Sequence, residues 1–195
     1  MIAIVDYGVG NIRSVANALR RAGARELLYT GSRDALLAAD KVILPGVGDA
    51  SWAMEALRSR SLDSFIPTLR QPVLGICVGA QLMCRSSEEG NVRCMDIFHT
   101  DVRRFVPQPG LKIPHMGWNS IAGLKGPLFK GLEEGGYVYF VHSYYPEICP
   151  EAIATARYGT PFCAALGRDN FYACQFHPEK SGAAGARILE NFLAL

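Results

Sequence analysis

The 195-residue sequence has no C-x-x-C pair, no long apolar run and no marked excess of charge of either sign. Without cysteines at that spacing we expect no zinc site. We expect no other metal site either. A membrane-spanning helix needs roughly 20 consecutive apolar residues, and no stretch approaches that length, so we expect no membrane association. The net charge of +2, from 20 basic and 18 acidic side chains, does not indicate a nucleic-acid partner.

The segment Met1–Asp6 lacks the basic region and cleavage site of a secretion signal. The six cysteines lie mostly in apolar strand-like or helix-like segments, which favours reduced thiols in the cytoplasm over a disulfide framework. Repeats, low-complexity segments and a domain linker are also missing. We therefore expect a single domain over residues 1–195.

The first half of the chain alternates strand-like and helix-like segments. Ile2–Val5, for example, is the continuous apolar run of a strand buried on both faces of a parallel sheet. Such alternation favours right-handed β-α-β units. The pattern predicts strands at 2–5, 26–29, 41–44 and 73–76, and helices from an Asn11 N-cap to about 23, at 34–39, at 50–58 and at 62–69.

The second half is rich in strand-like segments separated by short turns. Gly167–Asn170 is typical of a hairpin connection, and apolar residues at helical spacing follow Ser181. Glu88–Asn91 has the composition of a polar surface loop. The expected strands are 101–106, 137–141, 153–156, 162–166 and 171–176. The expected fold is therefore α/β, with a central, mostly parallel sheet flanked by helices and with antiparallel strands added in the C-terminal half.

The segment Val73–Met83 carries the most specific local signal. It contains Gly75-Ile-Cys-Val-Gly79, the cysteine form of the nucleophile elbow, in which a sharp strand-to-helix turn presents a reactive side chain. Small residues beside Cys77 relieve crowding there, and a helix N-terminus favours thiolate over thiol. A bare G-x-C-x-G is equally compatible with an inert buried cysteine.

A cysteine nucleophile needs a base, and the base needs an orienting group. His177 follows an apolar strand-like segment, and Glu179 lies two residues later beyond Pro178. A carboxylate there can accept the imidazole N–H and fix its tautomer. His-x-Glu is also common as a strand or helix cap. His142 is an alternative base, but no carboxylate follows it before Glu147.

Gly8-x-Gly10 after the first strand resembles part of a dinucleotide-binding motif. Arg13 replaces the third glycine of G-x-G-x-x-G, so the match is weak. We expect no cofactor.

The elbow and the later Gln175-Phe-His-Pro-Glu179, in which His177 follows Cys77 by 100 residues, together resemble the paired signature of class I (triad-type) glutamine amidotransferases. The likeness spans the chain and is strongest to their glutaminase subunits of imidazole glycerol phosphate synthase, the HisH group. It is carried by Met1–Asn11, Leu44–Gly48, Pro114–Asn119, Tyr139–Tyr144 and His177–Gly182.

This resemblance implies a glutamine amidotransferase type 1 domain with Cys77, His177 and Glu179 as catalytic triad. Cys77 would attack the side-chain amide of glutamine, forming a thioester and releasing ammonia. The oxyanion hole would use the backbone N–H groups of Val78 and Val47. The implied substrate-binding residues are Gly46, Gly48, Gln81, Glu89, His142, Ser143 and Tyr144.

The resemblance also implies a partner, the (β/α)₈-barrel cyclase subunit HisF. With the ammonia, that subunit would convert a phosphoribulosyl-formimino aminoimidazole carboxamide ribotide (PRFAR) into imidazole glycerol phosphate and an aminoimidazole carboxamide ribotide (AICAR), in histidine biosynthesis. The docking face would include Asn11, Tyr137 and Lys180, and Trp118 is a further choice if it is exposed. Competing hypotheses are a γ-glutamyl hydrolase, a glutaminase for another synthase, an inert scaffold for a barrel and a nucleotide-binding module.

Overall fold

The computed structural model describes residues 1–8 and 11–195. Gly10 of the Gly8-x-Gly10 pattern lies outside the described residues. A seven-stranded sheet runs through the molecule in the order β11-β12-β13-β4-β3-β1-β2. Its strands are β1 (Ile2–Val5), β2 (Leu27–Thr30), β3 (Lys41–Leu44), β4 (Val73–Ile76), β11 (Ala152–Tyr158), β12 (Thr160–Arg168) and β13 (Phe171–Cys174).

The five strands from β13 to β2 are parallel, and β11 and β12 extend the sheet with antiparallel pairs. All residues of β1 and β4 are buried, because helices cover both faces of the parallel part. The mostly parallel α/β sheet expected from the sequence is thus confirmed. The final strand at 171 differs from expectation in one respect, since it pairs in parallel with β4.

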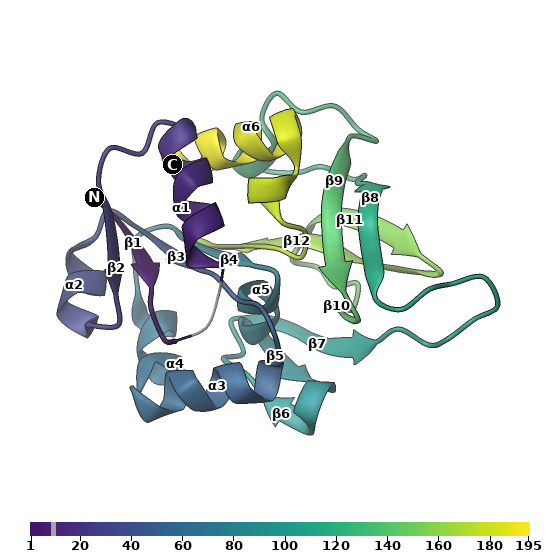
Figure 1. The fold of residues 1–195 in the computed structure, drawn as a ribbon, viewed down its shortest axis with the longest axis horizontal. Helices are drawn as coiled ribbons and strands as arrows, with labels where there is room; N and C mark the ends of the chain where they lie inside the picture. Colours follow the sequence, from purple (N-terminus) through teal and green to yellow (C-terminus); the bar gives the residue numbers. More distant parts are fainter. Residues whose placement is uncertain (9–10) are drawn as a thin grey trace.

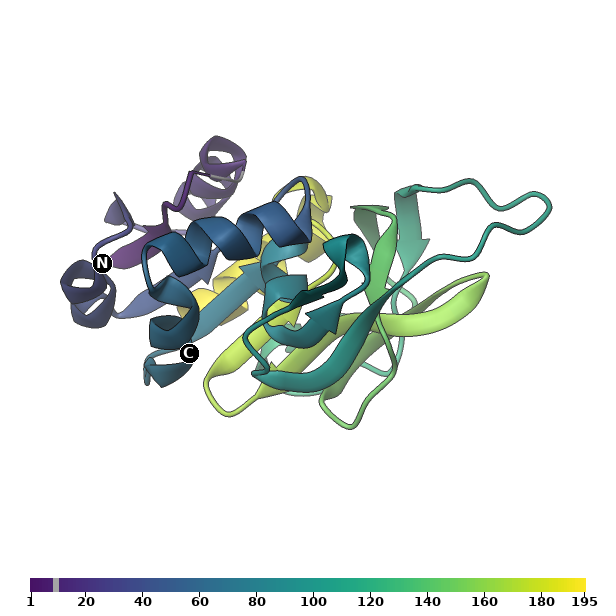
Figure 2. The same ribbon diagram turned by 90° about the horizontal axis from the view of Figure 1, so that it is seen from below.

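Helices lie on both sides of this sheet (Figures 1 and 2). α1 (Ile12–Arg21) and α6 (Gly182–Leu193) lie side by side on one face, and α3 (Ala50–Ser59) lies with α5 (Val78–Leu82) on the other. α2 (Arg33–Ala38) and α4 (Leu62–Phe65) are short. Side chains of Asn11, Ser32 and Asp49 accept backbone N–H groups and cap α1, α2 and α3.

Two smaller sheets complete the fold. β10 (Tyr144–Pro146), β7 (Phe98–Arg104), β5 (Cys84–Ser87) and β6 (Val92–Arg93) form one in that order, and β8 (His115–Ser120) pairs with β9 (Tyr137–His142) in the other. The expectation that all later strands join the central sheet is therefore wrong. β5, β8 and β10 were not expected, because their polar and aromatic residues do not alternate as a half-buried strand does.

Two expected helices differ in extent. The helix expected at 62–69 ends at Phe65 and continues as the 3-10 turn η1 (Ile66–Thr68), which contains Pro67. The helix expected over 80–83 begins earlier, because α5 starts at Val78, directly after the elbow cysteine. Further 3-10 turns are η2 (Glu89–Asn91), η3 (Pro127–Phe129) and η4 (Pro178–Lys180), so the polar loop expected at 88–91 contains a turn.

Gly185 fixes the packing of α6 against η4. A Cβ atom at Gly185 would collide with the carbonyl oxygen of Pro178 and would lie 2.9 Å from the Cβ of Ser181. α6 thus lies directly behind the segment that carries His177 and Glu179.

We predict that Gly185→Ala destabilises the protein, although alanine favours a helix by about 1 kcal/mol. The clash involves backbone atoms, so overpacking should lower the free energy of unfolding by about 1–3 kcal/mol. Urea denaturation measures the change. Ala183→Ser, at an exposed position of the same helix, is the control and should change it by less than about 0.5 kcal/mol. A stabilised Gly185→Ala would contradict this packing.

Candidate active site

The site lies where three neighbouring strands of the central sheet end. β13, β4 and β3 are adjacent, and they lead into Gln175–Glu179, Cys77 and Pro45–Gly48 respectively. The carboxyl ends of parallel strands form the usual ligand-binding edge of an open α/β sheet. Pro45–Gly48, about 30 residues before Cys77, and Gln175–Glu179, about 100 residues after it, thus meet at one edge of the sheet.

Cys77 occupies the sharp turn that the G-x-C-x-G spacing predicts. Its φ of 55° and ψ of −113° are strained for a residue with a side chain. The turn is held by a hydrogen bond from the Cys77 N–H to the carbonyl of Cys174, at 2.8 Å. A Cβ at Gly75 would lie 2.6 Å from the Met83 Sδ, and one at Gly79 would collide with the Leu44 carbonyl, so both positions require glycine.

His177 and Glu179 form a buried pair beside this cysteine. The His177 Nδ1 and the Glu179 Oε1 are 2.8 Å apart, and the two side chains are 5% and 1% exposed. Because the carboxylate accepts, Nδ1 carries the proton in the neutral ring. Nε2 is then the nitrogen that can exchange a proton with Cys77.

The charge state of His177 follows from these neighbours. Burial alone would lower its pKa, but hydrogen bonds and charge from Cys77 and Glu179 outweigh burial and raise the pKa to about 9. The imidazolium therefore persists through neutral pH when a thiolate lies beside it. The Cys77 thiol has another acceptor in the Val141 carbonyl oxygen, 3.7 Å away.

The backbone of His177 is fastened to β9. Its N–H donates to the Tyr139 carbonyl at 2.9 Å. The buried Ser181 hydroxyl donates to the His177 carbonyl at 2.6 Å and accepts the Tyr139 N–H at 2.9 Å. Ser181 thus positions the histidine. It lies within the family-like segment His177–Gly182, but no role was expected for it from the sequence.

A cavity of about 240 Å³ opens at Cys77. Most of the residues expected to bind substrate line it, together with Pro114 and Val141, which were not expected. The lining residues are Gly48, Cys77, Val78, Gln81, Glu89, Pro114, Val141, His142, Ser143 and Tyr144.

The wall of this cavity is held by a chain of buried hydrogen bonds. The Tyr144 carbonyl oxygen accepts from the His142 Nδ1 at 2.7 Å and from the Gln81 Nε2 at 2.9 Å. The Gln81 Nε2 also donates to the Gln175 Oε1 at 2.9 Å. Both hydrogens of the Gln81 amide nitrogen are therefore used, and its oxygen is the atom left for a ligand.

The same chain determines the tautomers of two histidines. The His142 Nδ1 must donate to a carbonyl, so its Nε2 can only accept, and it lies 2.9 Å from the His115 Nδ1. The His115 Nε2 then accepts from the Asn119 amide at 3.4 Å. Burial lowers the pKa of His142 to about 3 and that of His115 to about 4, so both are neutral. His142 is therefore a much weaker base than His177.

Comparison with known proteins identifies the family. The family model described as glutamine amidotransferase class-I matches residues 3–195. The chain is 57% identical to the imidazole glycerol phosphate synthase subunit HisH of Bacteroides fragilis, over 100% of this chain and 99% of that protein. The HisH of Escherichia coli K12 is 48% identical, with the same shares covered.

The chain belongs to the class I glutamine amidotransferases. Solved structures agree on the fold. A crystal structure described as a glutamine amidotransferase matches with a TM-score of 0.75 at 17% identity, covering 100% of this chain and 98% of that one. The structure of PurLQS from Thermotoga maritima matches with a TM-score of 0.70 at 20% identity, covering 99% of this chain and 97% of that one.

The segment of this amidotransferase expected to complete the oxyanion hole packs directly on the elbow. Gly46 is buried, and a Cβ there would collide with the Gly79 nitrogen. Gly48 has a φ of +89°, which favours glycine, and the Val47 side chain is 36% exposed. The buried Tyr7 hydroxyl donates to the Pro45 carbonyl at 2.7 Å and so fixes the start of the segment. This role of Tyr7 was not expected from the sequence.

Glu89 lies in η2 and also lines the cavity. Its Oε2 accepts the Ala50 N–H at 2.9 Å, at the start of α3. Burial raises the pKa of Glu89. The carboxylate is thus fixed by one bond while its remaining oxygen is available to a ligand.

Of the residues expected at a partner interface, Tyr137 and Lys180 are exposed, and Lys180 directly follows Glu179. Tyr137 is 61% exposed at the start of β9, and the Lys180 Nζ lies 5.8 Å from the centre of the Tyr139 ring. Trp118 is 54% exposed and packs edge-on against Tyr139. Asn11 is partly buried, and its side chain caps α1.

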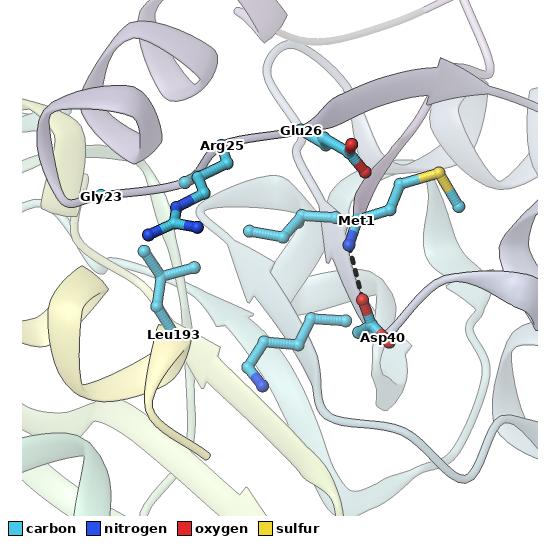
Figure 3. Close-up of a pocket in the computed structure, with 9 residues that line it drawn as sticks. Met1, Gly23, Arg25, Glu26, Asp40 and Leu193 are labelled. Carbon is cyan, nitrogen blue, oxygen red and sulfur yellow. Dashed lines mark hydrogen bonds and ion pairs between the residues drawn. The ribbon is translucent and has the colours of Figure 1, made fainter.

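A second cavity, of about 350 Å³, lies at the opposite edge of the sheet, where β1 and β3 begin (Figure 3). Met1 pairs there through its amino group with Asp40, and Arg25, Glu26 and Leu193 complete the wall. In the described part of the chain no group of three or more His, Cys, Asp or Glu could hold a metal ion. No helix described is long and apolar enough to cross a membrane.

We predict that Glu179→Gln lowers the pKa of His177 from about 9. The amide keeps the shape of the carboxylate but loses the charge that stabilises the imidazolium. Titration of the imidazole nitrogens by NMR measures the shift. His115 and His142 serve as internal controls and should stay neutral above a pH of about 5 in both proteins. An unchanged His177 midpoint would show that Glu179 does not stabilise its charged form.

Proposed function

We propose that this chain hydrolyses glutamine to glutamate and ammonia through Cys77, His177 and Glu179, as the glutaminase subunit of an imidazole glycerol phosphate synthase. The observation that carries the proposal is the strained cysteine elbow, which adjoins a buried His–Glu pair and opens into a cavity of about 240 Å³. The family and the full-length HisH relatives support it.

In the first half of the reaction, the Cys77 thiolate attacks the carbonyl carbon of the glutamine side-chain amide. The His177 imidazolium gives its proton to the leaving nitrogen, the C–N bond breaks, and ammonia departs from a glutamyl thioester. In the second half, His177 takes a proton from water as the water attacks the thioester. The sulfur leaves and glutamate is released. Glu179 holds the imidazole in orientation in both halves.

The tetrahedral intermediates carry a negative oxygen that needs donors. The Val78 N–H belongs to the first turn of α5, where backbone N–H groups have no acceptor within the helix. We assign it as one donor and the Val47 N–H as the other. Gly46 brings the Val47 segment into contact with the elbow, and Gly48 gives it rotational freedom.

The far end of glutamine carries an ammonium and a carboxylate. We assign Glu89 and the amide oxygen of Gln81 to the ammonium, because both are acceptors fixed on the cavity wall. The Ser143 hydroxyl, between His142 and Tyr144 on the same wall, is a donor for the carboxylate.

We assign the partner as the (β/α)₈-barrel cyclase HisF, which would take the ammonia to form imidazole glycerol phosphate and AICAR from PRFAR in the cytoplasm. The exposed aromatic side chains of β8 and β9, next to Lys180, suit a docking face, since Trp and Tyr are enriched where proteins meet. Lys180 directly follows Glu179, so contact there would reach the triad.

We predict that Cys77→Ala abolishes synthesis of imidazole glycerol phosphate from glutamine but not from added ammonia. The variant lacks the nucleophile yet keeps the fold that meets the cyclase. Product formation by the complex with each nitrogen source measures this, with Cys174→Ala as a control for loss of a buried thiol. Unchanged glutamine-dependent synthesis would instead support a scaffold role.

We predict that Glu89→Gln raises the KM for glutamine about tenfold, with a smaller effect on kcat. The amide oxygen can still accept the Ala50 N–H, so only the charge facing the ammonium is lost. Steady-state kinetics of the complex measure the two constants. Glu88→Gln, at the neighbouring exposed glutamate, is the matched control and should leave the KM within about twofold. Equal effects at both positions would contradict the assignment.

A further inference from the structure

A pair of neighbouring cysteines lies outside the triad, one in the loop after β10 and the other in strand β12. The Cys149 Sγ is 3.9 Å from the Cys163 Sγ. Cys149 is half-buried, whereas Cys163 is fully buried, and the single hydrogen of its thiol can be donated either to the Glu147 carbonyl, at 3.1 Å, or to the Cys149 sulfur. The two sulfurs are in contact but not bonded, and only one of them is accessible to solvent reagents.

A carboxylate adjoins the accessible thiol. Glu151 lies beside the Cys149 thiol, and its Oε2 has no hydrogen-bond partner in the described part of the chain. The turn that joins Cys149 to Ala152 brings the two side chains together. A buried carboxylate oxygen without a partner is costly, so Glu151 is an acceptor beside Cys149 that is available for the thiol proton.

The two thiols differ in acidity. Donation from the Cys163 thiol lowers the pKa of Cys149 and outweighs burial and the Glu151 carboxylate, which both raise it. The same bond, together with burial, raises the pKa of Cys163. A thiol of lowered pKa at a half-exposed position is the reactive member of such a pair, and the buried thiol at its side is the resolving one.

We propose that Cys149 and Cys163 are an oxidation site for small peroxides, which reversibly forms a disulfide between the loop after β10 and strand β12. In the first step the Cys149 sulfur attacks a peroxide oxygen. An S–O bond forms as the O–O bond breaks, and the departing hydroxide takes the thiol proton, by way of Glu151, to leave as water. Cys149 is then a sulfenic acid.

In the second step the Cys163 sulfur attacks the sulfur of that sulfenic acid. An S–S bond forms, the S–O bond breaks, and the hydroxyl leaves as water with the Cys163 proton. Two thiols have then lost two electrons to one peroxide, which for hydrogen peroxide has become two waters. The sulfurs approach from 3.9 Å to the bonded distance of about 2.05 Å, a movement within reach of a surface loop.

The disulfide would restrict the movement of one wall of the cavity at Cys77. β10 carries Tyr144, whose carbonyl joins His142 to Gln81, and Cys149 follows β10 closely in the chain. Oxidation would bind this loop covalently to β12, and we expect slower amide hydrogen exchange over residues 144–149.

The test treats the full chain carrying Cys77→Ser, which removes the proposed nucleophile, with hydrogen peroxide and then alkylates the free thiols. Peptide mass spectrometry should find Cys149 linked to Cys163, with the link removed by a dithiol reductant. Cys163→Ala should instead leave Cys149 as a sulfenic acid that dimedone traps. Cys149→Ser should leave Cys163 unoxidised.

Glu151→Gln is the variant that tests the base without removing a buried thiol. It should slow dimedone labelling of Cys149 several-fold in the Cys163→Ala background. The proposal is overturned if Cys84, Cys94 or Cys174 oxidises as fast as Cys149, if Cys149 passes to sulfinic acid with Cys163 still free, or if Glu151→Gln labels at an unchanged rate. None of these results bears on glutamine hydrolysis, which Cys77→Ala tests separately.

Discussion

The close contact between the elbow at Cys77 and the neighbouring strand end is the constraint on which the rest of the site depends. A residue with a side chain combines a φ of 55° with a ψ of −113° only when its surroundings enforce it. Gly79 packs on the Leu44 carbonyl and Gly46 packs on the Gly79 nitrogen, so the end of β3 is pressed against the first turn of α5. The contact that strains the cysteine also brings the proposed oxyanion donors to it.

The other half of the site depends on a buried hydroxyl rather than on glycine. Ser181 joins the Tyr139 N–H to the His177 carbonyl, so the histidine keeps its place against β9. Tyr139 also bears the aromatic ring that contacts Trp118 and the Lys180 ammonium. The exposed aromatic surface and the histidine therefore share one stretch of β9. A partner that shifts this strand would move the base relative to the sulfur.

The sequence predicts those strands and turns of this molecule that depend on neighbouring residues in the chain. β1 and β4 are continuous apolar runs, β3 is apolar after Lys41, and the G-x-C-x-G spacing predicts the elbow, so these elements were found where expected. β8 and β10 were missed because their side chains do not alternate. The pairing of His115 with His142 depends on the register of β8 against β9, and no residue in either strand predicts that register. Tyr7 and Ser181 act through single long-range hydrogen bonds, and such bonds leave no pattern in the sequence.

Buried histidines in this protein adopt opposite charge states, and the difference comes only from their partners. Burial lowers the pKa of His142 to about 3, and the hydrogen bond from its Nδ1 to the Tyr144 carbonyl offsets only part of that effect. His177 meets Glu179 and Cys77, which raise its pKa to about 9. A proton that leaves Cys77 is therefore stabilised on His177 and not on His142. A neutral histidine thus lines the cavity, and a second histidine, beside the Cys77 sulfur, is the one that can hold a proton.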